Sequence, residues 1–149
     1  MLRMLASHAM NYNELNTWDY RNEKGQSVID IVNEHPEICL HSPESEYLSV
    51  VNEWLDHITI LSNQLTSWIP FTNRWLNNHI IIPYEVIYTK GPSDKLKYLT
   101  DGDWLIEDYP KFSDYSNIVL IDRPYNQSLD VPIRVRNPKQ LIDFLINVI

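Results

Sequence analysis

Residues 103–111, DWLIEDYPK, and residues 117–122, NIVLID, most directly indicate the fold of this chain. Each contains a short apolar run that is followed at once by an acid, Glu107 with Asp108 in the first and Asp122 in the second. Two further apolar runs come earlier, at residues 57–61 (HITIL) and residues 80–89 (IIIPYEVIYT). Apolar runs of this length, separated by helical segments, predict a parallel sheet that is covered on both faces. In such a sheet, functional side chains lie at the carboxyl ends of the strands.

Helical signals separate these runs. Ser27 is expected to cap a helix over residues 27–35, with Asp30 as its capping-box partner. Ser42 followed by Pro43 predicts the start of an amphipathic helix that continues to Leu55. Further helices are expected over residues 2–10, 71–78, 91–99 and, after Asn137-Pro138, 139–148, with a short edge strand at 132–135. We therefore expect one domain over residues 1–149, with a mostly helical region at 1–56 and an α/β core at 57–149.

Composition narrows the class of protein. The net charge of −8, from 12 Lys plus Arg and 20 Asp plus Glu, argues against a nucleic-acid-binding surface, which needs clustered cations. Cys39 is the only cysteine, so no internal disulfide is expected and a reducing compartment is favoured. No apolar run approaches the roughly 20 residues that a membrane span needs. We expect a cytoplasmic protein without a membrane partner.

Polar side chains follow the predicted strands. Ser62 and Asn63 follow the first strand, Lys95 lies on the short helix before the third, and Glu107 with Asp108 ends the third. A hydroxyl, an amide and a lysine can bind phosphoryl oxygens, and carboxylates can hold Mg²⁺. The same residues also fit a common turn and the solvated start of a loop, so both interpretations stay open on the pattern alone.

These residues also carry a family resemblance. ILSNQ (residues 60–64) resembles the second motif of the haloacid-dehalogenase-like superfamily, Lys95 lies where the lysine of the third motif falls, and DWLIEDYPK resembles the fourth motif. The resemblance is to the 5'(3')-deoxyribonucleotidase branch and covers most of residues 11–149. NTWDY (16–20) and IDRPYNQ (121–127) add to it.

The resemblance implies a Rossmann-like domain with a small helical cap and Mg²⁺-dependent removal of phosphate from nucleotides. It implies that Ser62 binds phosphate, that Lys95 holds the phosphoryl group, and that Glu107 and Asp108 lie beside the metal. Glu107 departs from the Asp-Asp pair that is usual at this place. The five histidines and Cys39 show no metal-ligand spacing and no Cys-His nucleophile.

The first motif of the family, a strand followed by Asp-x-Asp that supplies the nucleophile, has no counterpart before the cap-like region. Asp19 and Asp56 are the acids that could replace it, but neither follows a central strand. The first strand of the family lies between the strands that end here in Ser62 and in Glu107-Asp108. Without it we expect two half-sheets with unpaired edges. The halves could pair directly, residues 1–5 could fill the gap, or another chain could donate a strand.

Two functions from different classes follow. The first is a non-catalytic, nucleotidase-like protein that acts by binding a protein partner or a second copy of itself, for example a phage-encoded inhibitor or modulator of a host protein. The alternative is a Mg²⁺-dependent 5'(3')-deoxyribonucleotidase whose nucleophile lies outside this sequence. A third hypothesis is a module that binds nucleotides without chemistry.

Overall fold

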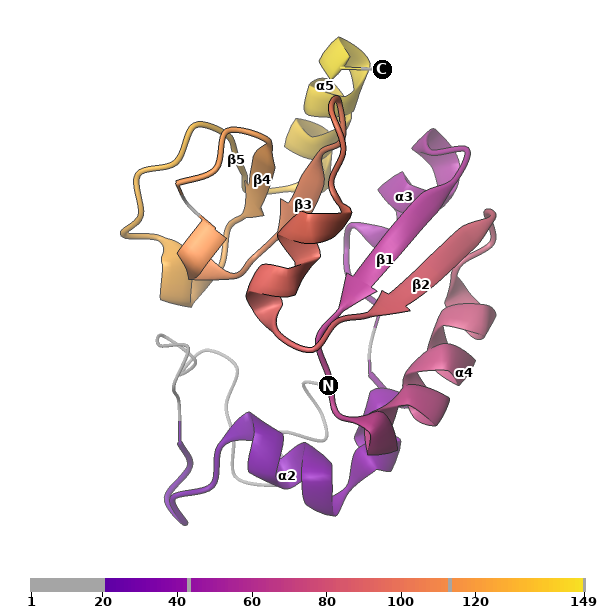
Figure 1. The fold of residues 1–149 in the computed structure, drawn as a ribbon, viewed down its shortest axis with the longest axis vertical. Helices are drawn as coiled ribbons and strands as arrows, with labels where there is room; N and C mark the ends of the chain where they lie inside the picture. The colour runs from indigo at the N-terminus through magenta and orange to yellow at the C-terminus, as the bar shows by residue number, and fades with distance from the viewer. Residues whose placement is uncertain (1–20, 43, 113, 149) are drawn as a thin grey trace.

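The computed structural model describes residues 21–42, 44–112 and 114–148, and the strands among them form two separate parallel sheets. In the first sheet, β1 (Ile58–Ser62) pairs with β2 (Tyr84–Tyr88). In the second, β4 (Ile118–Ile121) lies between β3 (Leu105–Glu107) and β5 (Arg134–Val135). The protein is thus a mixed α/β structure with small parallel sheets, as the alternation of strands and helices predicts (Figure 1).

Helices connect the strands and pack on the sheets. The α-helices are α2 (Val28–Glu34), α3 (Leu48–Trp54), α4 (Ile69–His79) and α5 (Pro138–Val148). The 3-10 helices are η2 (Pro36–Cys39), η3 (Thr66–Trp68), η4 (Pro92–Tyr98), η5 (Pro110–Phe112) and η6 (Pro124–Asn126). The helix expected over residues 2–10, and a strand at residues 1–5, lie outside the described residues.

Helix α2 begins as the sequence predicts. The Ser27 hydroxyl oxygen accepts a hydrogen bond from the backbone N–H of Asp30 at 3.1 Å, and the Asp30 carboxylate accepts one from the backbone N–H of Ser27 at 2.8 Å. These two bonds form a capping box, which satisfies N–H groups that the first turn leaves free. The hydrogen bonds from Ser27 lower the pKa of Asp30 because they stabilise its ionised form.

The predicted start of the next helix is wrong. Helix α3 begins at Leu48, six residues after Ser42. The Ser42 hydroxyl instead donates to the carbonyl oxygen of Ile38 at 3.2 Å, at the end of η2. A serine hydroxyl can bond to the backbone on either side of it, and here the preceding helix takes it.

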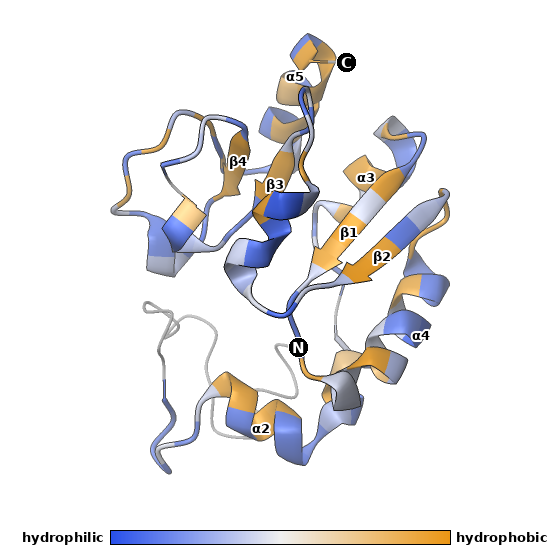
Figure 2. Ribbon diagram, viewed as in Figure 1, coloured by the Kyte–Doolittle hydropathy of each residue, from blue (hydrophilic) through white to orange (hydrophobic). Residues whose placement is uncertain are grey.

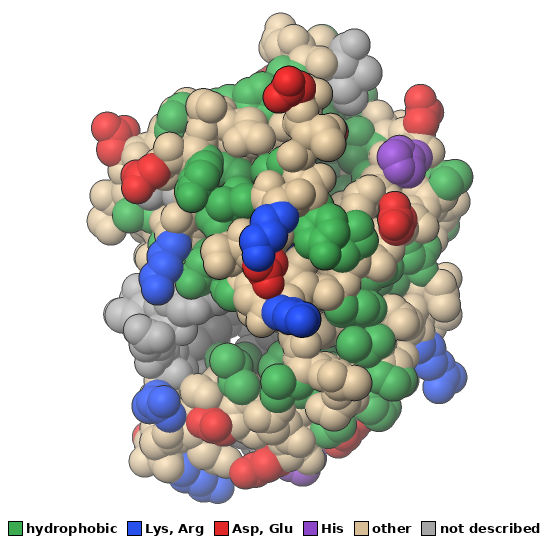
Figure 3. Space-filling model, viewed as in Figure 1, with side chains coloured by type: hydrophobic (Ala, Val, Ile, Leu, Met, Phe, Trp, Pro, Cys, Tyr) green, Lys and Arg blue, Asp and Glu red, His purple; other side chains and the backbone are tan. Residues whose placement is uncertain are grey.

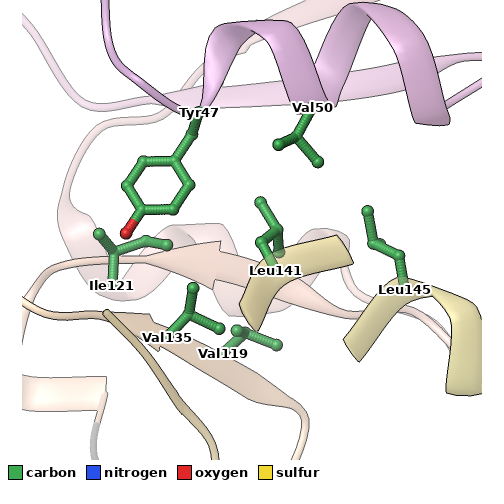
Figure 4. Packing of buried hydrophobic residues seen from close by; sticks show 7 residues of the cluster. All are labelled: Tyr47, Val50, Val119, Ile121, Val135, Leu141 and Leu145. Atoms are coloured by element: carbon green, nitrogen blue, oxygen red, sulfur yellow. The ribbon is translucent and has the colours of Figure 1, made fainter. Parts of the chain in front are cut away.

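The main core lies on one face of the three-stranded sheet. Every residue of β4 is buried, with at most 7% of its surface exposed. Val119 and Ile121 of β4 and Val135 of β5 point toward α3 and α5, as Figure 4 shows. Val50 of α3, Leu141 and Leu145 of α5, and Tyr47, the residue before α3, complete this cluster. On the other face of β4, Ile118 packs with Leu105 and Phe112. Burial on both faces explains why β4 is a continuous apolar run.

The two-stranded sheet is built differently, although its strands are also largely apolar (Figure 2). None of the residues of β1 and β2 is fully buried. The hydroxyls of Tyr84 and Tyr88 donate to Asn77 and Asn73 of α4, which ties β2 to that helix. Leu61 of β1 packs against the cluster that contains Leu105, together with Leu96 of η4 and Leu99, the residue that follows η4. Helix η4 therefore bridges the two sheets.

Candidate functional site at the carboxyl ends of the strands

A buried ion pair joins η4 to the end of β3. The Lys95 ammonium contacts the Glu107 carboxylate, and their side chains are only 14% and 10% exposed. Burial raises the pKa of the Glu107 carboxyl, although the adjacent Lys95 ammonium acts in the opposite direction. The second oxygen of Glu107 accepts a hydrogen bond from the backbone N–H of Asp108 at 3.0 Å. Both carboxylate oxygens of Glu107 thus have protein donors.

Asp108, the neighbouring acid, is also held by other protein groups. Its carboxylate accepts a hydrogen bond from the Tyr125 hydroxyl and lies 3.9 Å from the Arg123 guanidinium nitrogen Nε. Both partners come from the segment that follows β4, where Arg123 is also stacked 5.9 Å above the ring of Tyr47. The two acids at the end of β3 are therefore each compensated by a cation from another element.

A second polar cluster holds the segment after β4 in place. Asn126 is completely buried, and its side-chain amide donates to the carbonyl oxygens of Asp108 and Ile121, both at 2.9 Å. Arg134 of β5 donates to the Asp122 carboxylate at 2.6 Å and to the Asn126 side-chain oxygen at 3.0 Å. The Arg134 side chain is only 9% exposed. The Arg134–Asp122 ion pair can stabilise the local structure because nearly every N–H of the guanidinium has an acceptor.

Ser62 and Asn63 lie at the carboxyl end of the other sheet. The carbonyl oxygen of Ser62 accepts a hydrogen bond from the backbone N–H of Thr89 at 2.8 Å, which closes the β1–β2 pairing. Ser62 is half-buried, and Asn63 is exposed. The structure thus brings Lys95, Glu107 and Asp108 into one polar cluster and attaches Ser62 and Asn63 to the end of the other sheet.

Glu107 and Asp108 lie side by side at the end of β3, and their carboxylates accept hydrogen bonds from protein donors. Among the residues that the structure describes, no group of three or more His, Cys, Asp or Glu side chains could hold a metal ion. Mg²⁺ is usually bound through one or two carboxylates and keeps several of its waters. In this structure both carboxylate oxygens of Glu107 and one oxygen of Asp108, Oδ2, accept hydrogen bonds from Lys95, Tyr125 and a backbone N–H.

An Asp-x-Asp sequence does occur in the described chain, at Asp101-Gly102-Asp103, but at the opposite end of β3. Asp103 accepts hydrogen bonds from the backbone N–H and the hydroxyl of Thr100, at 2.7 and 2.8 Å. Gly102 has a φ of 93°, a left-handed conformation that glycine adopts without strain. The sequence is a turn that leads into β3. Asp56 is exposed before β1, and Asp19 lies outside the described residues.

Arg123 and Arg134 are the site residues that sequence reasoning missed. Arg123 pairs with Asp108 and Arg134 pairs with Asp122, and both acids lie at strand ends. The sequence pattern assigns Arg123 to a loop and Arg134 to a short edge strand. An arginine inside an apolar strand, as in PIRV (132–135), is the signal that could have pointed to a buried ion pair.

No helix in the described part of the chain is long and apolar enough to cross a membrane. Comparison of the chain with protein-family models, curated proteins and solved structures finds no match.

Proposed function

We propose that this chain is a non-catalytic protein, with the fold of the nucleotidase branch of the haloacid-dehalogenase-like superfamily, that acts by binding another protein as an inhibitor or regulator. The observation that carries the proposal is the division of the sheet. β1 pairs only with β2, and β3 pairs only with β4, so each has one side without a partner strand among the described residues. Open strand edges are sites at which another chain can pair.

The polar cluster at the strand ends supports the same function. A phosphatase of the proposed ancestry needs a lysine directed at the phosphoryl group and acids directed at a metal. Here Lys95 and Glu107 neutralise each other in a nearly buried pair. The pair, together with the Asp108–Tyr125 hydrogen bond, resembles a structural network that fixes η4 and the segment after β4 against β3.

A phosphatase assay tests this proposal. The purified chain would be incubated with 5'- and 3'-deoxynucleotides and Mg²⁺, beside Lys95→Ala and Asp108→Asn variants. We expect no phosphate release above the buffer rate from any of the three proteins. We also expect a protein partner to co-purify with the tagged chain in a fixed ratio. Turnover that both substitutions abolish, without a co-purifying protein, would contradict the proposal.

A Mg²⁺-dependent 5'(3')-deoxyribonucleotidase is the second candidate, and the meeting of Lys95, Glu107 and Asp108 favours it. For that function, Lys95 would have to leave Glu107 when a phosphoryl group binds, and another segment or chain would have to supply a nucleophile. Calorimetry with deoxynucleotides and Mg²⁺ distinguishes a nucleotide-binding protein, with or without phosphatase activity, from the protein-binding function proposed first. Heat of binding that disappears in the Lys95→Ala variant would favour a nucleotide site.

A further inference from the structure

We propose that the partner contributes an extended segment, with basic residues followed by apolar ones, that pairs as a parallel strand between β1 and β3. The inference rests on the proposed protein-binding function and names the chemistry of the partner. β1 and β3 are neighbours in Figure 1, and Leu61 of β1 packs against the cluster that contains Leu105 of β3. The two strands are nevertheless not paired with each other.

Backbone hydrogen bonds define the open edge of β1. In a parallel ladder, alternate residues direct both their N–H and their C=O to the same neighbouring strand. Ile58 donates to Pro83, and Ser62 accepts from Thr89, so Ile58, Ile60 and Ser62 bond toward β2. The N–H and C=O groups of the intervening residues Thr59 and Leu61 must therefore point away from β2.

The same reasoning defines the open edge of β3. The N–H of Leu105 donates to the carbonyl of Asn117, so Leu105 and Glu107 bond toward β4. The N–H and C=O groups of Ile106 point away from β4, and the side chain of Ile106 is 37% exposed. The arrows of both sheets in Figure 1 point toward the same side of the molecule. A strand that runs parallel to β1 and β3 can thus bond to both edges.

The residues around this gap determine the chemistry of the segment. Leu61 and Ile106 border it with apolar side chains, which favours an apolar strand of about five residues. The amino ends of the strands carry exposed acids, Glu53 and Asp56 before β1 and Asp101 and Asp103 before β3. Lys or Arg residues placed before the apolar run would meet these acids. Figure 3 shows acidic and basic side chains interspersed over most of the face in view.

Binding of synthetic peptides to the full chain tests the inference. The probe is a fluorescent peptide of about seven residues, with two Lys followed by alternating Val, Ile and Thr. One control peptide carries Glu in place of both Lys, and another carries N-methyl groups on its central amides. We expect the Lys peptide to bind about fivefold more tightly than the Glu peptide at low salt, with the difference reduced at high salt. The N-methylated peptide should not bind.

A pair of protein variants locates the binding site. Thr59→Pro removes an N–H group from the open edge of β1. Val86→Pro removes an N–H group from the outer edge of β2. Val86 lies opposite Ile60 in the register, so its N–H points away from β1. We expect loss of binding only for Thr59→Pro, with circular dichroism showing that both variants are folded. In the unaltered protein, the amides of Thr59, Leu61 and Ile106 should become protected from hydrogen exchange when the peptide is added, whether or not the variants fold.

The outcomes separate this inference from the proposed function. A co-purified partner whose binding is unaffected by Thr59→Pro would leave protein binding intact and overturn strand addition. Absence of peptide binding, or binding without protection of those three amides, would overturn it too. If the chain alone forms a dimer in which these amides are protected, the occupant is a second copy, and the proposed foreign segment is wrong. Phosphatase turnover would instead count against the proposed function.

Discussion

The two sheets of this protein differ in how much of them is buried. In the three-stranded sheet, β4 has partners on both sides and helices or loops on both faces, and all of its residues are buried. In the two-stranded sheet, β1 and β2 have one partner strand each within the part of the chain that the structure describes, and neither has a fully buried residue. Two-stranded sheets are marginal in isolation. The comparison indicates that most of the stability of the chain comes from β3–β5 with α3 and α5. The strands β1 and β2 depend on their contacts with α4 and η4.

Matched leucine truncations test this difference, and we expect from them the largest effect. Leu120→Ala in β4 removes a side chain that is 1% exposed, and it should lower the free energy of unfolding by about 3 kcal/mol. Leu61→Ala in β1 removes the same atoms from a half-buried position and should cost about 1 kcal/mol. Urea unfolding followed by circular dichroism measures both. Equal losses would show that the two sheets share one continuous core.

The Lys95–Glu107 pair, which connects η4 to β3, should give the next largest effect. Lys95→Met leaves the Glu107 carboxylate nearly buried and without its cation, so unfolding free energy at neutral pH should fall by about 2 kcal/mol. Lys97→Met is the matched control, because the Lys97 side chain of the Lys97–Asp94 pair on the same helix is 74% exposed, so this pair should contribute nothing measurable. If both substitutions have the same effect, the pair does not link η4 to β3.

The loss in Lys95→Met should also depend on pH. Burial already raises the pKa of Glu107, and removal of the ammonium raises it further. A carboxyl whose pKa is raised in the folded state favours folding when protonated, and this contribution is lost as the pH rises through that raised pKa. The difference between variant and unaltered protein should therefore shrink as the pH falls toward 4. A difference that is constant from pH 7 to pH 4 would show that Glu107 is not the group left unpaired.

The sequence predicted the strands well because their signal is local. Short β-branched runs bounded by turn residues correctly indicated β1 through β5, and Ser27 and Asn137 cap the helices that they were expected to cap. The start of α3 was wrong because a hydroxyl can bond backward or forward, and tertiary contacts decide which. Local patterns carry no information about that choice.

The candidate site was predictable only in part. The resemblance implied that Lys95 and Glu107 belong to one site, and the two side chains are in contact. Their partners could not be predicted, because the pairing of Asp108 with Tyr125 and of Asp122 with Arg134 depends on the order of strands in the sheet.

Hydrogen exchange of the chain alone, resolved by residue, tests the central claim that β1 and β3 present open edges. We predict rapid exchange at the amides of Thr59, Leu61 and Ile106, which point away from their partner strands. The amides of Ile60 and Glu107, which bond to β2 and β4, should exchange more slowly under the same conditions. Protection of Thr59, Leu61 and Ile106 equal to that of Ile60 and Glu107 would show that the gap is already closed, and it would contradict the account.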